Sequence, residues 1–182
     1  MKEIIQLKIT LQGTKPPIWR RILVDKSTKF SLLHSIILTT MGWSGGHLYE
    51  FNINGYRLGV PYKEDDGWGG KLLDSSKKSL HSIIGETKGK FQYTYDFGDD
   101  WQHIITIEKF LPKDKNLIYP ICIDGELNCP PEDCGGVWGY YDFLEKIRDK
   151  KHPEHEEMLE WLGEEYDPEY FDKELINKML NH

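Results

Sequence analysis

Residues 93–103 read YTYDFGDDWQH, which places four aromatic residues, three aspartates, a glycine and a histidine within eleven positions. Side chains along a strand alternate between the two faces of a sheet, so the loop length decides which of them face inward. A three-residue loop of Gly98, Asp99 and Asp100 leaves one face aromatic or apolar apart from His103. A two-residue loop would mix a charge into that face. We therefore predict a hairpin over residues 91–110 whose rings, together with His103, face the core.

The predicted register pairs Phe97 with Trp101, Tyr95 with His103, Tyr93 with Ile105 and Phe91 with Ile107. The aspartates then belong to the turn, where their side chains accept hydrogen bonds from backbone amides without any ligand. The alternative is a cation site, because three carboxylates within five residues suit calcium or magnesium. In that case Asp96, Asp99, Asp100 and His103 are candidate catalytic residues of a metal-dependent hydrolase or nuclease.

The sequence before this hairpin predicts two strands followed by a helix. Apolar residues alternate with polar ones over residues 5–11 and recur over 18–24, with Pro16-Pro17 marking the turn between two strands. The spacing of apolar residues over 30–41 is helical, and Gly42 is well placed to end that helix. Another strand and an Asn54-Gly55 turn follow. This order over residues 1–60 is typical of the start of a β-grasp fold.

The rest of the chain completes the predicted architecture. Residues 62–78 are polar and glycine-rich and predict a surface loop, whereas residues 139–181 carry helical spacing. We expect a single α+β domain over residues 1–182. Its β-grasp-like mixed sheet is extended by the antiparallel 91–110 hairpin, and its C-terminal helical segment packs on that sheet.

Composition and charge limit the class of protein. The chain has 182 residues and a formal net charge of −7, with seven Lys and Arg against two Asp and Glu in residues 1–30 and six against thirteen in residues 141–182. An acidic chain disfavours general nucleic-acid binding, because phosphate contacts need a positive surface. No apolar run is long enough to span a bilayer, and the N-terminus does not resemble a signal peptide. We expect a soluble, cytoplasmic protein with reduced thiols and no membrane partner.

Three further residue sets are candidate sites. Cys122, Cys129 and Cys134 could hold zinc if His47 or His103 supplied a fourth ligand, although buried structural thiols explain the same residues. Lys15, Arg20 and Arg21, beside Trp19, could contact nucleic acid, although arginine stems that cover a strand explain them too. The acidic and aromatic loops could contact a partner through Asp65, Asp66, Trp68, Asp99 and Asp100.

Five longer segments carry a family resemblance. They are LKITLQGTKPPIWRRILV, LHSIILTTMGW with HLYEF, YTYDFGDDWQHIITIEK, CIDGELNCPPEDCGGVWGYYDFLE and WLGEEYDPEYFD, which together span nearly the whole chain. On these segments the chain resembles the plasmid Ri open-reading-frame-three-like family, small proteins of bacterial and archaeal plasmids and chromosomes. The resemblance implies an association with mobile elements. It does not imply an activity, because the family has no agreed biochemical function, and the resolvase-like label of some relatives finds no recombinase constellation here.

Three functions follow as hypotheses. The sequence carries no complete catalytic set, which favours a noncatalytic binding or adaptor protein with a protein partner and no required cofactor. The second hypothesis is the metal-dependent hydrolase or nuclease described above, with zinc or another divalent cation. The third is a DNA-binding accessory protein that uses Lys15, Arg20 and Arg21.

Overall fold

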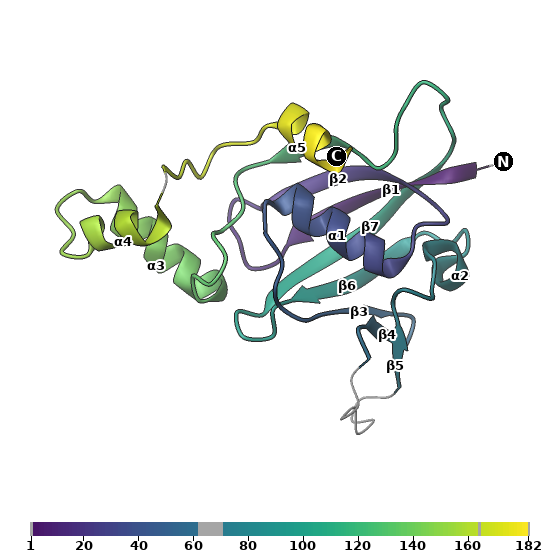
Figure 1. Cartoon of the computed structure of the whole chain (residues 1–182), viewed down its shortest axis with the longest axis horizontal. Helices are drawn as coiled ribbons and strands as arrows, with labels where there is room; N and C mark the ends of the chain where they lie inside the picture. Colours follow the sequence, from purple (N-terminus) through teal and green to yellow (C-terminus); the bar gives the residue numbers. More distant parts are fainter. Residues whose placement is uncertain (1, 62–70, 164, 182) are drawn as a thin grey trace.

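The structure is a computed structural model that describes residues 2–61, 71–163 and 165–181. Eight strands form a single sheet in the order β5-β4-β3-β6-β7-β1-β2-β8 (Figure 1). The strands are β1 (Lys2–Leu11), β2 (Trp19–Asp25), β3 (Tyr49–Ile53), β4 (Tyr56–Gly59), β5 (Leu72–Asp74), β6 (Gly89–Tyr95), β7 (Trp101–Pro112) and β8 (Ile121–Glu126). The helices are α1 (Phe30–Met41), α2 (Leu80–Ile84), α3 (Gly136–Arg148), α4 (His155–Leu162) and α5 (Lys173–Leu180). The expected α+β class with a mixed sheet is confirmed.

The N-terminal strands and helix form where the sequence predicts them. The predicted strands correspond to β1 and β2, which pair antiparallel, and the predicted helix over 30–41 is α1. Gly42 ends α1 in the left-handed conformation with φ 87°, which glycine adopts without steric cost. Alternation places Ile5, Leu7 and Ile9 on the face that α1 covers, and all three are fully buried.

The 91–110 hairpin forms, but its register differs from the predicted one by two residues. Tyr95 pairs with Trp101 and Tyr93 pairs with His103, so residues 96–100 form the loop. A shift of two residues preserves which side chains face inward, and Tyr93, Tyr95, Trp101 and His103 are all buried as expected. Phe97 was expected opposite Trp101; instead it lies in the loop and is 53% exposed.

Two finer features of the predicted architecture are not borne out as stated. The β-grasp-like description is not confirmed: β1 lies between β2 and β7 and is antiparallel to both, and the parallel pair in the described sheet is β4 with β5. The β6–β7 hairpin lies in the middle of the sheet, between β3 and β1, and does not extend its edge.

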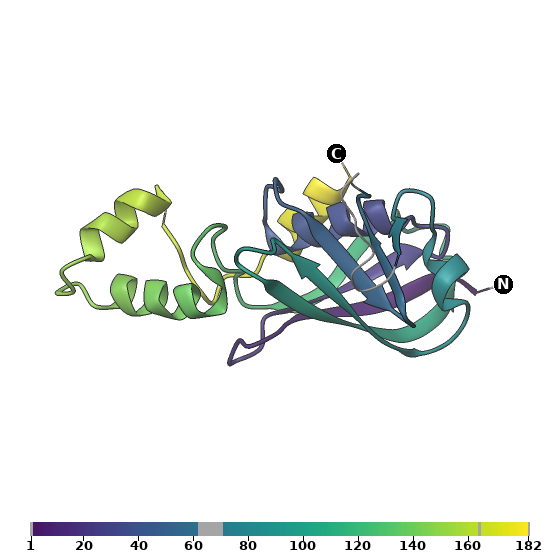
Figure 2. The same cartoon turned by 90° about the horizontal axis from the view of Figure 1, so that it is seen from below.

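The C-terminal helices divide into two groups. Helix α5 packs against α1 and β8, on the same face of the sheet as α1 (Figures 1 and 2). Helices α3 and α4 pack against each other and extend from one end of the sheet as a helical arm, residues 136–162 (Figure 2). The prediction that the helical end packs on the sheet therefore holds for α5, whereas the arm projects beyond it. None of the described helices has the length and apolar character needed to cross a membrane.

Candidate metal centre and adjoining groove

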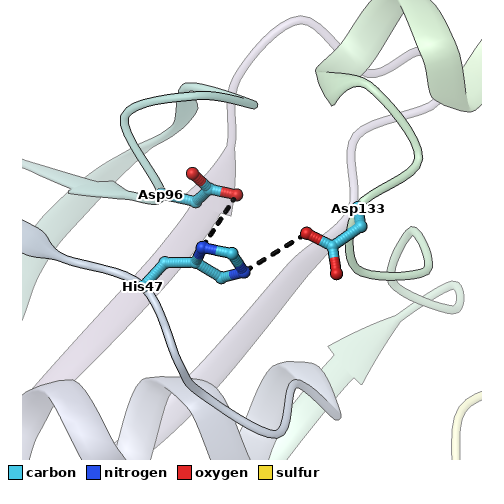
Figure 3. Close-up of side chains that lie close together, drawn as sticks. All are labelled: His47, Asp96 and Asp133. Carbon is cyan, nitrogen blue, oxygen red and sulfur yellow. Dashed lines mark ion pairs between the residues drawn. The ribbon is translucent and has the colours of Figure 1, made fainter.

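One histidine and two aspartates meet at the end of the sheet from which the helical arm extends. His47 Nδ1 lies 3.6 Å from Asp96 Oδ2, and His47 Nε2 lies 3.2 Å from Asp133 Oδ1 (Figure 3). Taking one nitrogen or oxygen from each residue, the three ligand atoms all lie within 4.8 Å of one another. Within residues 2–61, 71–163 and 165–181, this is the group of three His, Cys, Asp or Glu side chains that could hold a metal ion.

The three residues come from three separate loops. His47 precedes β3, Asp96 begins the β6–β7 loop, and Asp133 precedes α3. Both aspartates have positive φ, 55° for Asp96 and 58° for Asp133, a conformation that Asp tolerates better than most residues. The Asp96 amide donates to the Leu48 carbonyl, and the Gly98 amide donates to Asp96 Oδ1. These bonds fix Asp96 and leave its Oδ2 toward the imidazole.

The cluster carries excess negative charge. Neither Asp96 nor Asp133 has a Lys or Arg within ion-pair distance among the residues that the structure describes. The imidazole of His47 supplies at most one positive charge against two carboxylates. Asp96 is buried while the Asp133 side chain is 68% exposed, so the cluster has one enclosed carboxylate and one that reaches solvent.

Glu132 fastens the loop that carries Asp133. Its carboxylate accepts hydrogen bonds from the Ser44 amide and hydroxyl, from the Gly45 amide and from the Tyr95 hydroxyl. Burial alone would raise the pKa of Glu132, but the bonds from Ser44 and Tyr95 hold it below its ordinary value. Burial and the adjacent Glu132 carboxylate raise the pKa of Tyr95, so its hydroxyl stays a donor.

A groove of about 730 Å³ adjoins this cluster. Its walls are the end of α1 with Trp43, residues 128–133, the end of α4 with Trp161, residues 165–170 and the exposed side of α5. The Trp43 indole donates to the Pro130 carbonyl over 2.9 Å, and Tyr166 donates to the Cys129 carbonyl over 2.8 Å. Asp133 lines the groove and also belongs to the His47 cluster, so the two features share a wall.

The candidate catalytic set of Asp96, Asp99, Asp100 and His103 is not brought together. Asp96 faces His47, the Asp99 carboxylate accepts from the Gly135 amide, and the Asp100 carboxylate accepts from Gln102. His103 is fully buried on the inward face of β7, its Nδ1 3.0 Å from the Trp101 carbonyl. Backbone pairing of β7 with β6 and β1 holds His103 in the core, so its imidazole cannot reach the loop carboxylates.

The three cysteines do not form a common site either. Cys122 lies in β8 with its Sγ 3.5 Å from the Asp124 carbonyl, and Cys129 Sγ lies 3.0 Å from the Met41 sulfur. Cys134 faces the Gly136 carbonyl at the start of α3. Burial raises the pKa of all three thiols, that of Cys134 to about 12 with a further contribution from Asp99. The three sulfur atoms contact different partners in the described structure and are not gathered into one group of ligands.

The predicted nucleic-acid residues are also dispersed. Arg20 is only 3% exposed, because its guanidinium points into the protein and donates to backbone carbonyls. Arg21 on the opposite face of β2 forms ion pairs with Glu108 and Asp124, which neutralise its charge. Lys15 is exposed in the β1–β2 turn. Arg20 is therefore unavailable to phosphate, which corrects its assignment to that surface.

Of the predicted partner-binding residues, two can be placed. Asp99 and Asp100 lie in the β6–β7 loop, where Asp99 contacts the start of α3. Asp65, Asp66 and Trp68 lie outside the described residues. The sequence reasoning missed Asp133 altogether and considered His47 only as a fourth ligand for a cysteine zinc site. The available signal was that His47, Asp96 and Asp133 each belong to a segment that carries the family resemblance.

Fold and site together define an α+β protein in which three of the segments that carry the family resemblance meet at the His47 cluster. These segments are HLYEF, YTYDFGDDWQHIITIEK and CIDGELNCPPEDCGGVWGYYDFLE. The chain belongs to the plasmid pRiA4b ORF-3-like protein family, whose model matches residues 3–175. It is 38% identical over 180 residues to uncharacterized protein y4hQ of Sinorhizobium fredii (strain NBRC 101917 / NGR234), covering 98% of this chain and 91% of that one.

A solved structure shares the fold. The crystal structure of a protein of unknown function, MM3350 from Methanosarcina mazei Go1, superimposes with a TM-score of 0.84 and 39% sequence identity. The match covers 94% of this chain and 96% of that one. One relative is an uncharacterized protein and the other a protein of unknown function.

Proposed function

We propose that this chain is a noncatalytic binding protein that docks a cationic, apolar polypeptide segment in the groove beside the His47 cluster. The observation that carries the proposal is the combination of exposed apolar side chains with carboxylates in the lining of one depression. Exposed apolar surface that is gathered in one place commonly marks an interaction site.

The apolar part of the groove comes from two helices. Trp161 at the end of α4 is 47% exposed, and Leu175 and Met179 on α5 are 46% and 52% exposed. Leu175 and Met179 are four residues apart, so they lie on one side of α5. A partner that covered these side chains would gain roughly 25 cal/mol for each Å² of apolar surface removed from water.

The charged part of the groove favours a basic partner. Glu132, Asp133 and Glu165 line it, and its lining contains no Lys or Arg within the described part of the chain. The surrounding C-terminal region is also acidic, with six Lys and Arg against thirteen Asp and Glu in residues 141–182. Opposite charge on the partner would speed association and select against acidic competitors.

The shape of the groove supports a polymer segment as its occupant. A second depression of about 120 Å³ continues from it, and the two share lining residues at the end of α1 and along α5. Two adjoining depressions of this kind accommodate an amphipathic helix or an extended peptide, which anchors several apolar side chains at once.

The test uses two synthetic peptides, because the natural partner is unidentified. One is a helical peptide of Leu and Lys, and the other has Glu at every Lys position. We expect the full chain to bind the cationic peptide at least tenfold more tightly than the anionic one, measured by fluorescence anisotropy. The double substitution Leu175→Asn and Met179→Asn should weaken the cationic peptide at least tenfold, because it removes the apolar anchors.

The matched control is Ile118→Asn, which changes an apolar side chain of the β7–β8 loop that is 70% exposed and does not line the groove. This variant should bind within twofold of the unmodified chain. Equal binding by the Leu175 and Met179 double variant would refute the docking site, as would equal affinity for the two peptides.

A further inference from the structure

We propose that His47, Asp96 and Asp133 form a site for a divalent transition-metal ion, with Zn²⁺ bound most tightly. The proposal is independent of peptide docking, since it concerns the cluster and not the apolar lining of the groove. Three features carry it: the mutual distance of the ligand atoms, the uncompensated charge, and the chemical type of the ligands.

The distances are close to those of a metal site. The three ligand atoms lie within 4.8 Å of one another, and His47 Nε2 is 3.2 Å from Asp133 Oδ1 (Figure 3). Zinc binds imidazole nitrogen and carboxylate oxygen at about 2.0–2.2 Å, which brings neighbouring ligand atoms to roughly 3–3.5 Å. The two carboxylates face different ring nitrogens, since Asp96 Oδ2 lies 3.6 Å from His47 Nδ1 whereas Asp133 Oδ1 lies beside Nε2. Asp96 is held by Gly98 and the Leu48 carbonyl, so an ion between Asp96 and Nδ1 requires the exposed Asp133 side chain to rotate toward it.

The charge supplies a separate reason. Two carboxylates converge on one imidazole, and the described residues place no Lys or Arg within ion-pair distance of either carboxylate. Even a protonated His47 leaves the cluster negative, and Asp96 is buried, where an uncompensated charge costs most. A divalent cation would neutralise both carboxylates and would be ligated by His47 through one nitrogen.

The chemical types of the three ligands favour some divalent cations over others. One imidazole with two carboxylates is a mixed nitrogen and oxygen set, which suits Zn²⁺ or Mn²⁺ better than the all-oxygen sites preferred by Ca²⁺ and Mg²⁺. The general affinity order of divalent ions places Zn²⁺ above Mn²⁺. Three protein ligands leave at least one coordination position for water or a bound molecule.

The site would also have a mechanical effect. Its three ligands come from the segment before β3, the β6–β7 loop and the loop before α3. A bound ion would therefore tie together the sheet and the base of the helical arm. Because Asp133 lines the groove as well, the ion would fix one of the groove walls.

The test is isothermal titration of ZnCl₂, MnCl₂ and MgCl₂ into the full chain after chelator treatment. We expect one ion per chain, with affinity in the order Zn²⁺, Mn²⁺, Mg²⁺. Asp133→Asn should weaken Zn²⁺ binding at least tenfold, since an amide is a poorer ligand than a carboxylate. Because the Asp133 side chain is 68% exposed, this substitution leaves the core untouched.

Two control variants exclude other zinc ligands. Asp100→Asn changes a loop carboxylate that contacts Gln102 and not His47, and Cys134→Ser removes the partly exposed thiol. Both should bind Zn²⁺ within twofold of the unmodified chain. Absence of binding by the unmodified chain would overturn the proposal, and so would unchanged affinity in Asp133→Asn. Broadening of the His47 ring signals by Mn²⁺ in NMR spectra supplies a readout that does not depend on stability; broadening centred elsewhere would also overturn it.

Discussion

Replacing Arg20 with methionine is expected to lower the free energy of unfolding by about 2–3 kcal/mol, the range for leaving buried acceptors without a charged donor. The Arg20 guanidinium donates to the carbonyls of Thr40, Trp19 and Glu126 and to the Cys129 sulfur, and it lies 4.9 Å from the centre of the Phe171 ring. Its carbonyl acceptors are backbone groups, which remain when the side chain is removed. Methionine fills a similar volume but donates no hydrogen bond, so buried carbonyls lose their partner.

Arg21→Met is the matched control, because it changes the neighbouring residue of the same strand. Arg21 is only partly buried and pairs with Glu108 and Asp124. Ion pairs at the surface contribute about 1 kcal/mol or less, so this variant should stay close to the unmodified chain. Urea unfolding followed by tryptophan fluorescence measures both. A loss below about 1 kcal/mol for Arg20→Met would mean that Arg20 is not buried, and the nucleic-acid surface would again include it.

Acid should destabilise the fold through the buried His103 and the partly buried His34. Burial lowers the pKa of His34 and of His103 to about 4, from an ordinary value near 6.5. Between these values the unfolded chain binds protons that the folded chain does not. The stability contributed by neutral histidines is therefore complete above about pH 6.5 and is lost as the pH falls to about 4. The loss should be roughly 3 kcal/mol for His103 and less for the partly exposed His34.

The substitution His34→Gln removes the contribution of His34 and leaves that of His103. His34 stacks on Tyr49 with ring centres 3.6 Å apart, and its Nδ1 lies 2.8 Å from the Tyr93 hydroxyl. Glutamine can keep a hydrogen bond to Tyr93 but does not titrate. The slope of unfolding free energy against pH, measured between pH 4 and 6.5, should fall by nearly one proton in this variant. An unchanged slope would show that His34 is not held neutral in the folded chain.

Alternation along the strands could be predicted from the sequence, whereas the loop that joins β6 and β7 could not. The faces of Tyr93, Tyr95, Trp101 and His103 follow from a period of two, and they survive a register shift of two residues. In the observed register the Asp96 amide donates to the carbonyl of Leu48, in the segment before β3. Because that bond joins two segments far apart in sequence, a local pattern does not reveal it. The positive φ of Asp96 and Asp100, 55° and 54°, is also compatible with many turns that a local pattern does not distinguish.

The burial of Arg20 was indicated by the strand pattern, but the usual exposure of arginine indicated the opposite. It shares strand parity with Ile18 and Ile22, both buried, so a strict period of two places it on the inward face. The usual exposure of arginine and the adjacent Arg21 favoured a surface position instead. The acceptors that make its burial tolerable lie at residues 40, 126 and 129, which no local pattern connects to β2.

The candidate site was beyond local reasoning for the same physical cause. Asp96 follows His47 by 49 residues and Asp133 follows Asp96 by 37 residues, and each of the three lies in a loop. They meet because β3 and β6 are neighbours in the sheet and because Glu132 fastens the third loop to Ser44. Asp96 was identified as a candidate ligand, but with the partners nearest to it in sequence. The partners that the fold supplies come from other strands.

The NMR signals of the tryptophan indole N–H groups, recorded while the cationic peptide is added, test the binding function most directly. Trp43 and Trp161 line the groove, whereas Trp19 lies on β2 with its indole bonded to Glu126 and with Lys8 and Arg21 over its ring. We predict that the signals of Trp43 and Trp161 shift while that of Trp19 stays in place. A shift of Trp19 with the two groove signals unchanged would contradict the assignment of the groove as the binding face.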